Sequence, residues 1–215
     1  MMPAGMMPAG ELTDIMVSRG NPTEPDTGFR FPAPPGASAF DRSSIQGCSF
    51  PRGRGAASGG GAADVSRLFP DAFVLSADTV VVVDDRLLGK PADRREAGRM
   101  LAMLSGREHL VHTAVCLFQG RQGRLDETCV TTRVRFRPLA HGEIAAYLRT
   151  GECDDKAGAY AAQGAGNLLI ERISGSFTNV VGLPMTHTLA MLRRAGLLSV
   201  DRSGAGLYVL AGGKP

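Results

Sequence analysis

The clearest hydrophobic pattern along the chain is an unbroken run of β-branched and apolar residues, FVLSADTVVVV, over residues 73–83. This run is too continuous for a half-exposed strand, so it predicts a strand that is buried on both faces. In the segment 94–104, apolar side chains recur at positions i, i+3, i+4 and i+7. That spacing predicts an amphipathic helix, with Asp93 as its N-cap and Gly106 at its end.

Two further strands are predicted over residues 109–119 and 127–139, joined by a glycine-bearing hairpin. In the second strand, Arg133, Arg135 and Arg137 alternate with residues that suit a core, which predicts one buried face and one basic, solvated face.

The C-terminal half continues with shorter elements. The patterns predict a helix over 143–149, a final pair of strands over 167–173 and 177–182, and a last helix over 185–195. Since strands mix with helices and some of the strands form hairpins, we expect an α/β or α+β fold with a mixed sheet.

The first 64 residues differ in composition from the rest. They hold 8 proline and 11 glycine residues, and their few large apolar residues show no helical or strand period. Such a segment buries too little apolar surface to offset its ordering entropy. We therefore predict a low-complexity, disordered segment over 1–64, a folded domain over 65–198 and a tail over 199–215.

The overall composition excludes several classes of protein. A formal net charge of +3 gives no case for binding nucleic acid by bulk electrostatics. No window approaches the roughly 18 apolar residues that span a membrane, and the N-terminus lacks the pattern of a secretory signal. The four cysteines have no metal-site spacing, so we expect free thiols and a cytoplasmic location.

Asp78 is the first candidate for chemistry, because it interrupts the apolar run 73–83. A buried carboxylate is costly unless it is paired, hydrogen-bonded or metal-bound, and a strand end that opens on a cleft would relieve that cost. Asp78 could act as a general base or as a ligand of a hard divalent cation. A purely structural or turn-capping role is the alternative.

Three more polar side chains lie in loops rich in small residues. Lys90 stands between Gly89 and Pro91, which suits a phosphate contact but also a solvated loop lysine. Gln163 could read the edge of a base through its paired donor and acceptor, and Lys156 could add a second phosphate contact. For these two residues as well, exposure in a flexible loop is the alternative.

Taken in order, four segments carry a family resemblance: LSADTVVVVDDRLLGKP and the helix after it, TTRVRFRPL, EIAAYLRTGECDDKAGAYAAQG, and GSFTNVVGLPM. Together they are similar to the Maf family of nucleoside triphosphate pyrophosphatases over about 125 residues. The resemblance implies an α/β fold of the inosine triphosphate pyrophosphatase type, with a mixed sheet flanked by helices.

The resemblance also implies an activity and roles for individual residues. Family members hydrolyse a nucleoside triphosphate to the monophosphate and pyrophosphate with a divalent cation, Mg²⁺ or Mn²⁺. By this resemblance Asp78 is the proton acceptor, Thr79 helps to set substrate choice, and Lys90 contacts phosphate. Gln163 marks the subgroup that acts on dTTP and UTP. The expected partner is thus a nucleoside triphosphate, with no nucleic acid or membrane. The resemblance leaves open whether the protein forms a homodimer.

The chain departs from the family pattern in its first part. The family begins with a strand that leads into a Ser-x-Ser-Pro-Arg-Arg loop, and we find no such strand, loop and helix before Asp78; CSFPRGRG over 48–55 is only faintly similar. Two alternatives follow: a catalytically impaired nucleotide-binding or cell-division regulatory protein, or a truncated or misread gene product.

Overall fold

A six-stranded mixed sheet forms the centre of the computed structural model, which describes residues 15–19, 72–201 and 206–210. The strand order is β1-β2-β4-β5-β6, and β3 pairs with β2 at the edge that also holds β1. Strands β1 (Ile15–Arg19) and β2 (Phe73–Val83) are parallel, and all other pairs are antiparallel. This mixture confirms the predicted sheet type.

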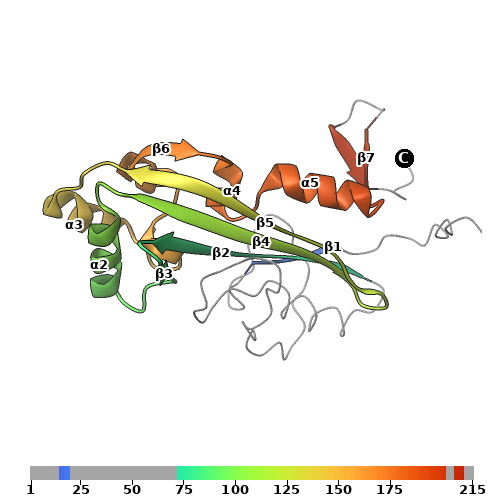
Figure 1. Ribbon diagram of the computed structural model, residues 1–215, viewed down its shortest axis with the longest axis horizontal. Coiled ribbons are helices and arrows are strands. Elements are labelled where there is room, and N and C mark those ends of the chain that lie inside the picture. Colours follow the sequence, from blue (N-terminus) through green and yellow to red (C-terminus); the bar gives the residue numbers. More distant parts are fainter. Residues whose placement is uncertain (1–14, 20–71, 202–205, 211–215) are drawn as a thin grey trace, which may run out of the picture.

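The long hairpin of β4 (Glu108–Gln119) and β5 (Gly123–Phe136) spans the length of the molecule (Figure 1). In β5, Val130, Thr132, Val134 and Phe136 are buried, as the alternation with arginine predicted. Arg135 and Arg137 on the other face make exposed ion pairs with Glu171 and Glu143. The hairpin therefore has the predicted core face and basic face.

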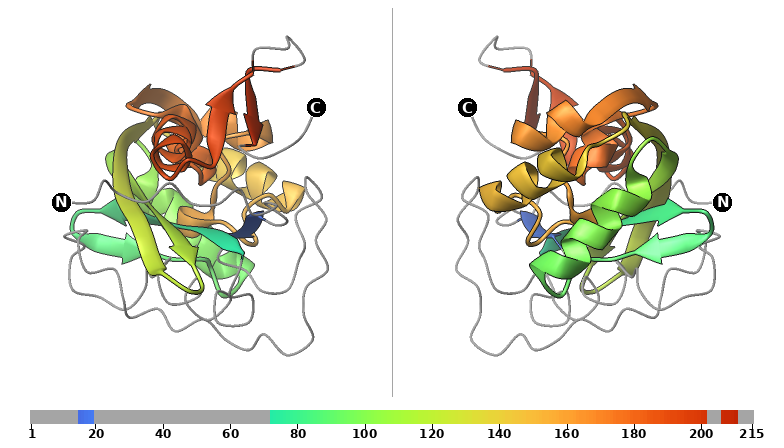
Figure 2. Two further views of the ribbon diagram at one scale, coloured as in Figure 1. Left: turned by 90° about the vertical axis from the view of Figure 1, so that its right-hand side faces the viewer. Right: turned by 90° about the vertical axis from the view of Figure 1, so that its left-hand side faces the viewer.

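Two hydrophobic cores lie on one face of the sheet, and each is covered by its own helices. Helices α2 (Arg94–Leu104) and α3 (His141–Thr150) cover the end of β2 that holds Val81 and Val83 (Figure 1). Helix α5 (Met185–Arg194) covers the beginning of β2, at Leu75 and Ala77. We call these the α2–α3 core and the α5 core; Figure 2 looks along the molecule at the helices over the sheet.

The N-terminus of α2 is capped as the sequence predicted. The Asp93 side chain accepts a hydrogen bond from the Glu96 backbone N–H at 2.6 Å, and the Glu96 carboxylate accepts from Ala92 N–H at 2.7 Å. The apolar stripe Ala97, Met100, Leu101 and Leu104 is buried in the α2–α3 core. Local capping and a helical apolar period thus agree at this helix.

The prediction of a strand over residues 177–182 is wrong. The segment forms a short helix, α4 (Phe177–Val181), in which the Ser176 hydroxyl accepts from Asn179 N–H and Gly182 ends the helix at φ 112°. The strand predicted over residues 167–173 is confirmed in part. The strand β6 (Ile170–Ser174) forms there, but its partner in the sheet is β5. The residues before it form a 3-10 helix, η2 (Gly164–Leu169).

Two short strands, β3 and β1, were not anticipated. β3 (Arg86–Leu88) folds back on β2 through a tight turn in which Asp84 and Asp85 have φ of 46° and 59°, as in the hairpin turns that favour Asp. β1 lies within the segment 1–64 that was expected to be disordered; the rest of that segment, including the 48–55 stretch and Cys48, is outside the described residues.

At the other end of the chain, β7 (Leu198–Val200) pairs with β8 (Tyr208–Leu210), so the boundary predicted at 198 falls at the start of a two-stranded sheet. Within the described residues, no helix has the length and hydropathy needed to cross a membrane.

Candidate active site

A band of hydrogen-bonded polar side chains separates the two hydrophobic cores. In β2, Thr79 stands between Ala77 of the α5 core and Val81 of the α2–α3 core, and it lies opposite Thr113 of β4. Asn179 of α4 reaches the same band, where its amide donates to Thr132 Oγ1 at 3.0 Å and to the Val111 carbonyl at 3.1 Å. We call these four residues, Thr79, Thr113, Thr132 and Asn179, the polar band.

The hydrogen bonds of the polar band fix the direction of the Thr79 hydroxyl. The buried Thr113 hydroxyl has one hydrogen and donates it to the Asn179 carbonyl at 3.0 Å. The 2.9 Å contact between the two threonine hydroxyls then requires Thr79 to be the donor. Thr79 is half-buried, and its oxygen keeps lone pairs. Such an oxygen can accept a hydrogen bond from a donor placed beside it.

Asp78 lies at a gap in the edge of the sheet. On the edge of β2 away from β4, β1 pairs with residues 73–77 and β3 pairs with residues 81–83. No strand in the described part of the chain pairs with residues 78–80 on that edge. A strand end would have relieved the cost of this carboxylate, but Asp78 is the sixth of the eleven residues of β2 and is half-buried.

The loops that carry the other candidates meet beside this gap. The Gly158 backbone N–H donates to the Gly89 carbonyl at 3.0 Å, which joins the Lys90 loop to the segment that contains Lys156 and Gln163. Gly158 has φ +70°, and a Cβ there would lie 3.1 Å from the Val81 side chain. The 3-10 helix η1 (Ala157–Ala159) therefore packs directly on β2, two residues beyond Thr79.

The structure places the three loop candidates at the surface. Lys90, Lys156 and Gln163 are all exposed, and Gln163 is the N-cap residue of η2. The ammonium group of Lys156 pairs with the neighbouring Asp155 carboxylate. An exposed pair of this kind contributes roughly 0–1 kcal/mol, so an incoming phosphate could compete for the lysine.

Aromatic packing supports the Gln163 segment from inside the α2–α3 core. His109 Nε2 lies 2.8 Å from the Tyr160 hydroxyl, and both rings make edge-on contacts with Phe136. Because β4 alternates, His112 points to the other face, where it bonds to Thr131. The support that His109 gives to the candidate loop was not predicted from the sequence.

Burial of His109 makes stability depend on pH. Burial lowers the pKa of His109 from 6.5 to about 4, so the unfolded chain binds a proton at higher pH than the folded chain does. The stability that neutral His109 contributes is complete above pH 6.5 and is lost as the pH falls from there toward 4. Burial lowers the pKa of His112 as well, which acts in the same direction.

We therefore expect the free energy of unfolding to fall by about 2 kcal/mol between pH 7.5 and pH 5 on account of His109. Urea unfolding of the wild type and His109→Gln at both pH values measures this contribution, and the variant should lose that part of the pH dependence. His141→Gln, at an exposed position on α3, is the control. Equal pH dependence in the wild type and His109→Gln would contradict the assignment.

Sequence reasoning missed the residues that act through tertiary contacts. Thr113 and Asn179 orient Thr79, yet Thr113 lies 34 residues from Thr79, and Asn179 lies another 66 residues beyond Thr113. The one local signal was Thr113, a polar residue in an apolar strand. Asn179 was hidden by the mistaken assignment of its segment to a strand.

The carboxylates suit a metal that is shared with a substrate better than a metal held by protein alone. In the described ranges, no three His, Cys, Asp or Glu side chains gather into a metal site. Mg²⁺ is usually bound by one or two carboxylates together with substrate phosphates. A single half-buried carboxylate in the middle of a strand, such as Asp78, is compatible with that kind of site.

Comparison with known proteins gives one consistent family. The model of the family described as Maf-like protein matches residues 54–195. Proteins named dTTP/UTP pyrophosphatase are similar to this chain: that of Bordetella parapertussis is 48% identical over 173 residues, covering 80% of this chain and 83% of the relative. That of Myxococcus xanthus is 52% identical over 134 residues, covering 62% and 66%, and that of Symbiobacterium thermophilum is 51% identical over 145 residues, covering 66% and 72%.

The extent of these matches bears on the N-terminal segment. Residues 65–215 number 151, so a match of 173 residues must reach into the segment 1–64. The family match also begins before residue 65. With two thirds of its length matched by the family model, and 48% identity to a relative over most of both sequences, the chain belongs to the Maf-like protein family.

Proposed function

We propose that this protein is a nucleoside triphosphate pyrophosphatase that hydrolyses dTTP and UTP to the monophosphate and pyrophosphate. The observation that carries the proposal is the name dTTP/UTP pyrophosphatase, which relatives 47–52% identical to this chain share. The arrangement of the site supports it, because the loops of Lys90 and Gln163 meet beside the gap at Asp78 and Thr79.

In the proposed reaction, the Asp78 carboxylate takes a proton from a water molecule as its oxygen attacks the α phosphorus. The bond between the α phosphorus and the bridging oxygen breaks, and pyrophosphate leaves with that oxygen. The ammonium groups of Lys90 and Lys156 neutralise the charge of the polyphosphate as it shifts toward the leaving group.

A divalent cation, Mg²⁺ or Mn²⁺, is the cofactor we propose, with the Asp78 carboxylate as its protein ligand. When bound, such an ion spreads the negative charge of the triphosphate. Asp78 is therefore proposed for two roles, as the general base and as the protein ligand of the metal.

The two residues that we assign to base recognition are Thr79 and Gln163. Uracil and thymine carry a hydrogen on N3, whereas cytosine has a lone pair there. The Thr79 oxygen, whose own hydrogen points to Thr113, can accept from that N3–H and would meet a lone pair in cytosine. Gln163 can donate an amide N–H to a carbonyl that neighbours N3 in the same bases.

The direct test is pyrophosphate release by the purified full-length chain with Mg²⁺ or Mn²⁺. We expect dTTP and UTP to be hydrolysed faster than dCTP, dATP or dGTP. Calorimetric binding of dTTP without any turnover would overturn the enzymatic proposal and favour a nucleotide-binding regulator.

Lys90→Ala should lower kcat/KM for dTTP by roughly 10- to 100-fold, because it removes a charged contact to phosphate of about 1.5–3 kcal/mol. Steady-state kinetics measures this, with Arg95→Ala as a control at another exposed cation, at the start of α2. An equal change in the two variants would show that Lys90 acts only through the net charge of the surface.

A further inference from the structure

The backbone on both sides of Gln163 is held by side chains from α3 and the turn after it. The Tyr147 hydroxyl accepts a hydrogen bond from Ala161 N–H at 3.0 Å, two residues before Gln163. The Glu152 carboxylate accepts from Ala165 N–H and from Gly166 N–H, both at 3.0 Å, two and three residues after it. Gln163 is thus an exposed residue in a short arch, residues 161–166, whose two ends are both bound by α3 and the turn after it.

The fit of the arch on Glu152 leaves no room for side chains. Gly164 has φ +72°, and a Cβ there would lie 2.5 Å from Glu152 Oε1. At Gly166, a Cβ would lie 2.1 Å from the Ala161 carbonyl oxygen. Gly164 therefore allows the backbone to close on the Glu152 carboxylate, and Gly166 allows it to close on the Ala161 carbonyl.

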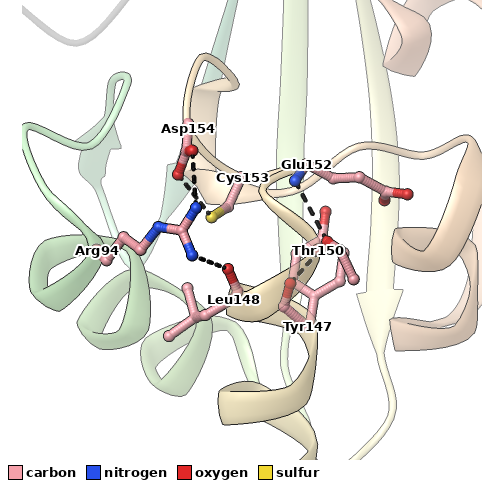
Figure 3. Close-up of polar contacts among 7 residues, drawn as sticks. All are labelled: Arg94, Tyr147, Leu148, Thr150, Glu152, Cys153 and Asp154. Carbon is pink, nitrogen blue, oxygen red and sulfur yellow. Dashed lines mark hydrogen bonds and ion pairs between the residues drawn. The ribbon is translucent and has the colours of Figure 1, made fainter.

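The support itself is fixed in place from α2. Arg94 donates to the Leu148 carbonyl at 2.8 Å, at the end of α3, and to Asp154 Oδ2 at 3.2 Å (Figure 3). Figure 3 shows the Glu152 side chain extending away from this pair, on the opposite side of the turn. Between them, Cys153 is fully buried and its thiol donates to Asp154. The turn is held from both sides, so Glu152 has a defined position.

We propose that Glu152 is a positioning residue that sets the orientation of Gln163 and thereby the preference of the site for uracil and thymine. The inference rests on the proposed function, since it assigns Gln163 to the base. A carboxylate that accepts from two successive backbone N–H groups makes strong, directional bonds. Loss of these bonds leaves residues 163–166 free to move, while the phosphate contacts and Asp78 stay in place.

The expected result is a change in KM and in base selectivity with little change in kcat. In Glu152→Ala we expect KM for dTTP to rise about tenfold and the selectivity for dTTP over dCTP to fall by about the same factor. Glu152→Gln keeps one acceptor oxygen and should retain part of both. Glu171→Gln, at an exposed glutamate of β6, is the matched control and should behave as the wild type.

A double-mutant cycle with Gln163→Ala separates positioning from general stability. If Glu152 acts through Gln163, Glu152→Ala should add almost nothing to the KM and selectivity changes of Gln163→Ala. Full additivity, or an equal loss of kcat for every nucleotide, would overturn the inference.

The wild type in the same experiment reports on the proposed function separately. If it releases no pyrophosphate, that function fails, and the same variants are then compared by their calorimetric affinities for dTTP and dCTP. In that setting an affinity ratio that Glu152→Ala leaves unchanged would overturn the positioning role, and a reduced ratio would support it.

Discussion

Replacing Asp78 with asparagine is expected to lower the rate of dTTP hydrolysis by about 100- to 10,000-fold, the range typical of a lost general base. The amide keeps the size of the side chain and an oxygen that can still accept the bond from Thr79 N–H, now 2.9 Å from Asp78 Oδ1. The fold and the polar band should therefore survive the change. What asparagine cannot do is take a proton from water or offer a charged ligand to a cation.

Pyrophosphate release measures the effect, and calorimetric binding of dTTP shows whether the site is still formed. Asp85→Asn is the matched control, because Asp85 is an exposed aspartate of the β2–β3 turn whose positive φ asparagine tolerates. Equal rates for the wild type and Asp78→Asn would remove Asp78 from the mechanism. Loss of both rate and binding, with the fold intact, would point to a role in holding substrate and metal.

The elements that sequence predicts well here are those in which local pattern and tertiary packing agree. The run 73–83 became β2 because its continuous apolar character suits a strand with neighbours on both sides. Helix α2 followed from Asp93 and its four buried apolar residues. In both cases residues within one element carried the information.

The segment 177–182 shows why other elements could not be predicted. Its valines favour a strand, and a helix of five residues is too short to display a period. Contacts outside the segment decide its conformation: Thr132 exchanges hydrogen bonds with Ser176, and Asn179 bonds across to β4 and β5. These partners lie 44 to 68 residues away, and a local sequence pattern does not predict contacts between residues so far apart.

Some residues of the candidate site could likewise be predicted from local pattern, and others could not. Asp78 could be identified because a carboxylate in an apolar strand needs an explanation, and Lys90 and Gln163 because small residues surround them. The meeting of the Lys90 and Gln163 loops could not be inferred, since the backbone bond between Gly158 and Gly89 joins residues far apart in the sequence. Two further residues acquire a role only through the fold: Thr113, which orients Thr79, and Glu152, which we propose as the residue that positions Gln163.

The largest expected effect on stability is at Phe136, which joins the core to the candidate loop. Its ring is fully buried and lies 5.1 Å from the His109 ring and 4.8 Å from the Tyr160 ring, measured between centroids. Phe136→Ala removes both contacts and leaves a cavity under the Gln163 segment. We expect the free energy of unfolding to fall by about 3–5 kcal/mol.

Urea unfolding at pH 7.5 measures this loss, and Phe177→Ala is the matched control, because Phe177 is 43% exposed at the start of α4. The control should lose much less stability, since part of its ring already faces solvent. Where Phe136→Ala is still folded, KM for dTTP should also rise, because Tyr160 loses the ring that packs against it only three residues before Gln163. Similar losses of stability in the two variants would mean that the cluster of His109, Phe136 and Tyr160 does not support this loop. A normal KM for dTTP in a destabilised Phe136→Ala would mean that packing in the core does not affect substrate binding at the site.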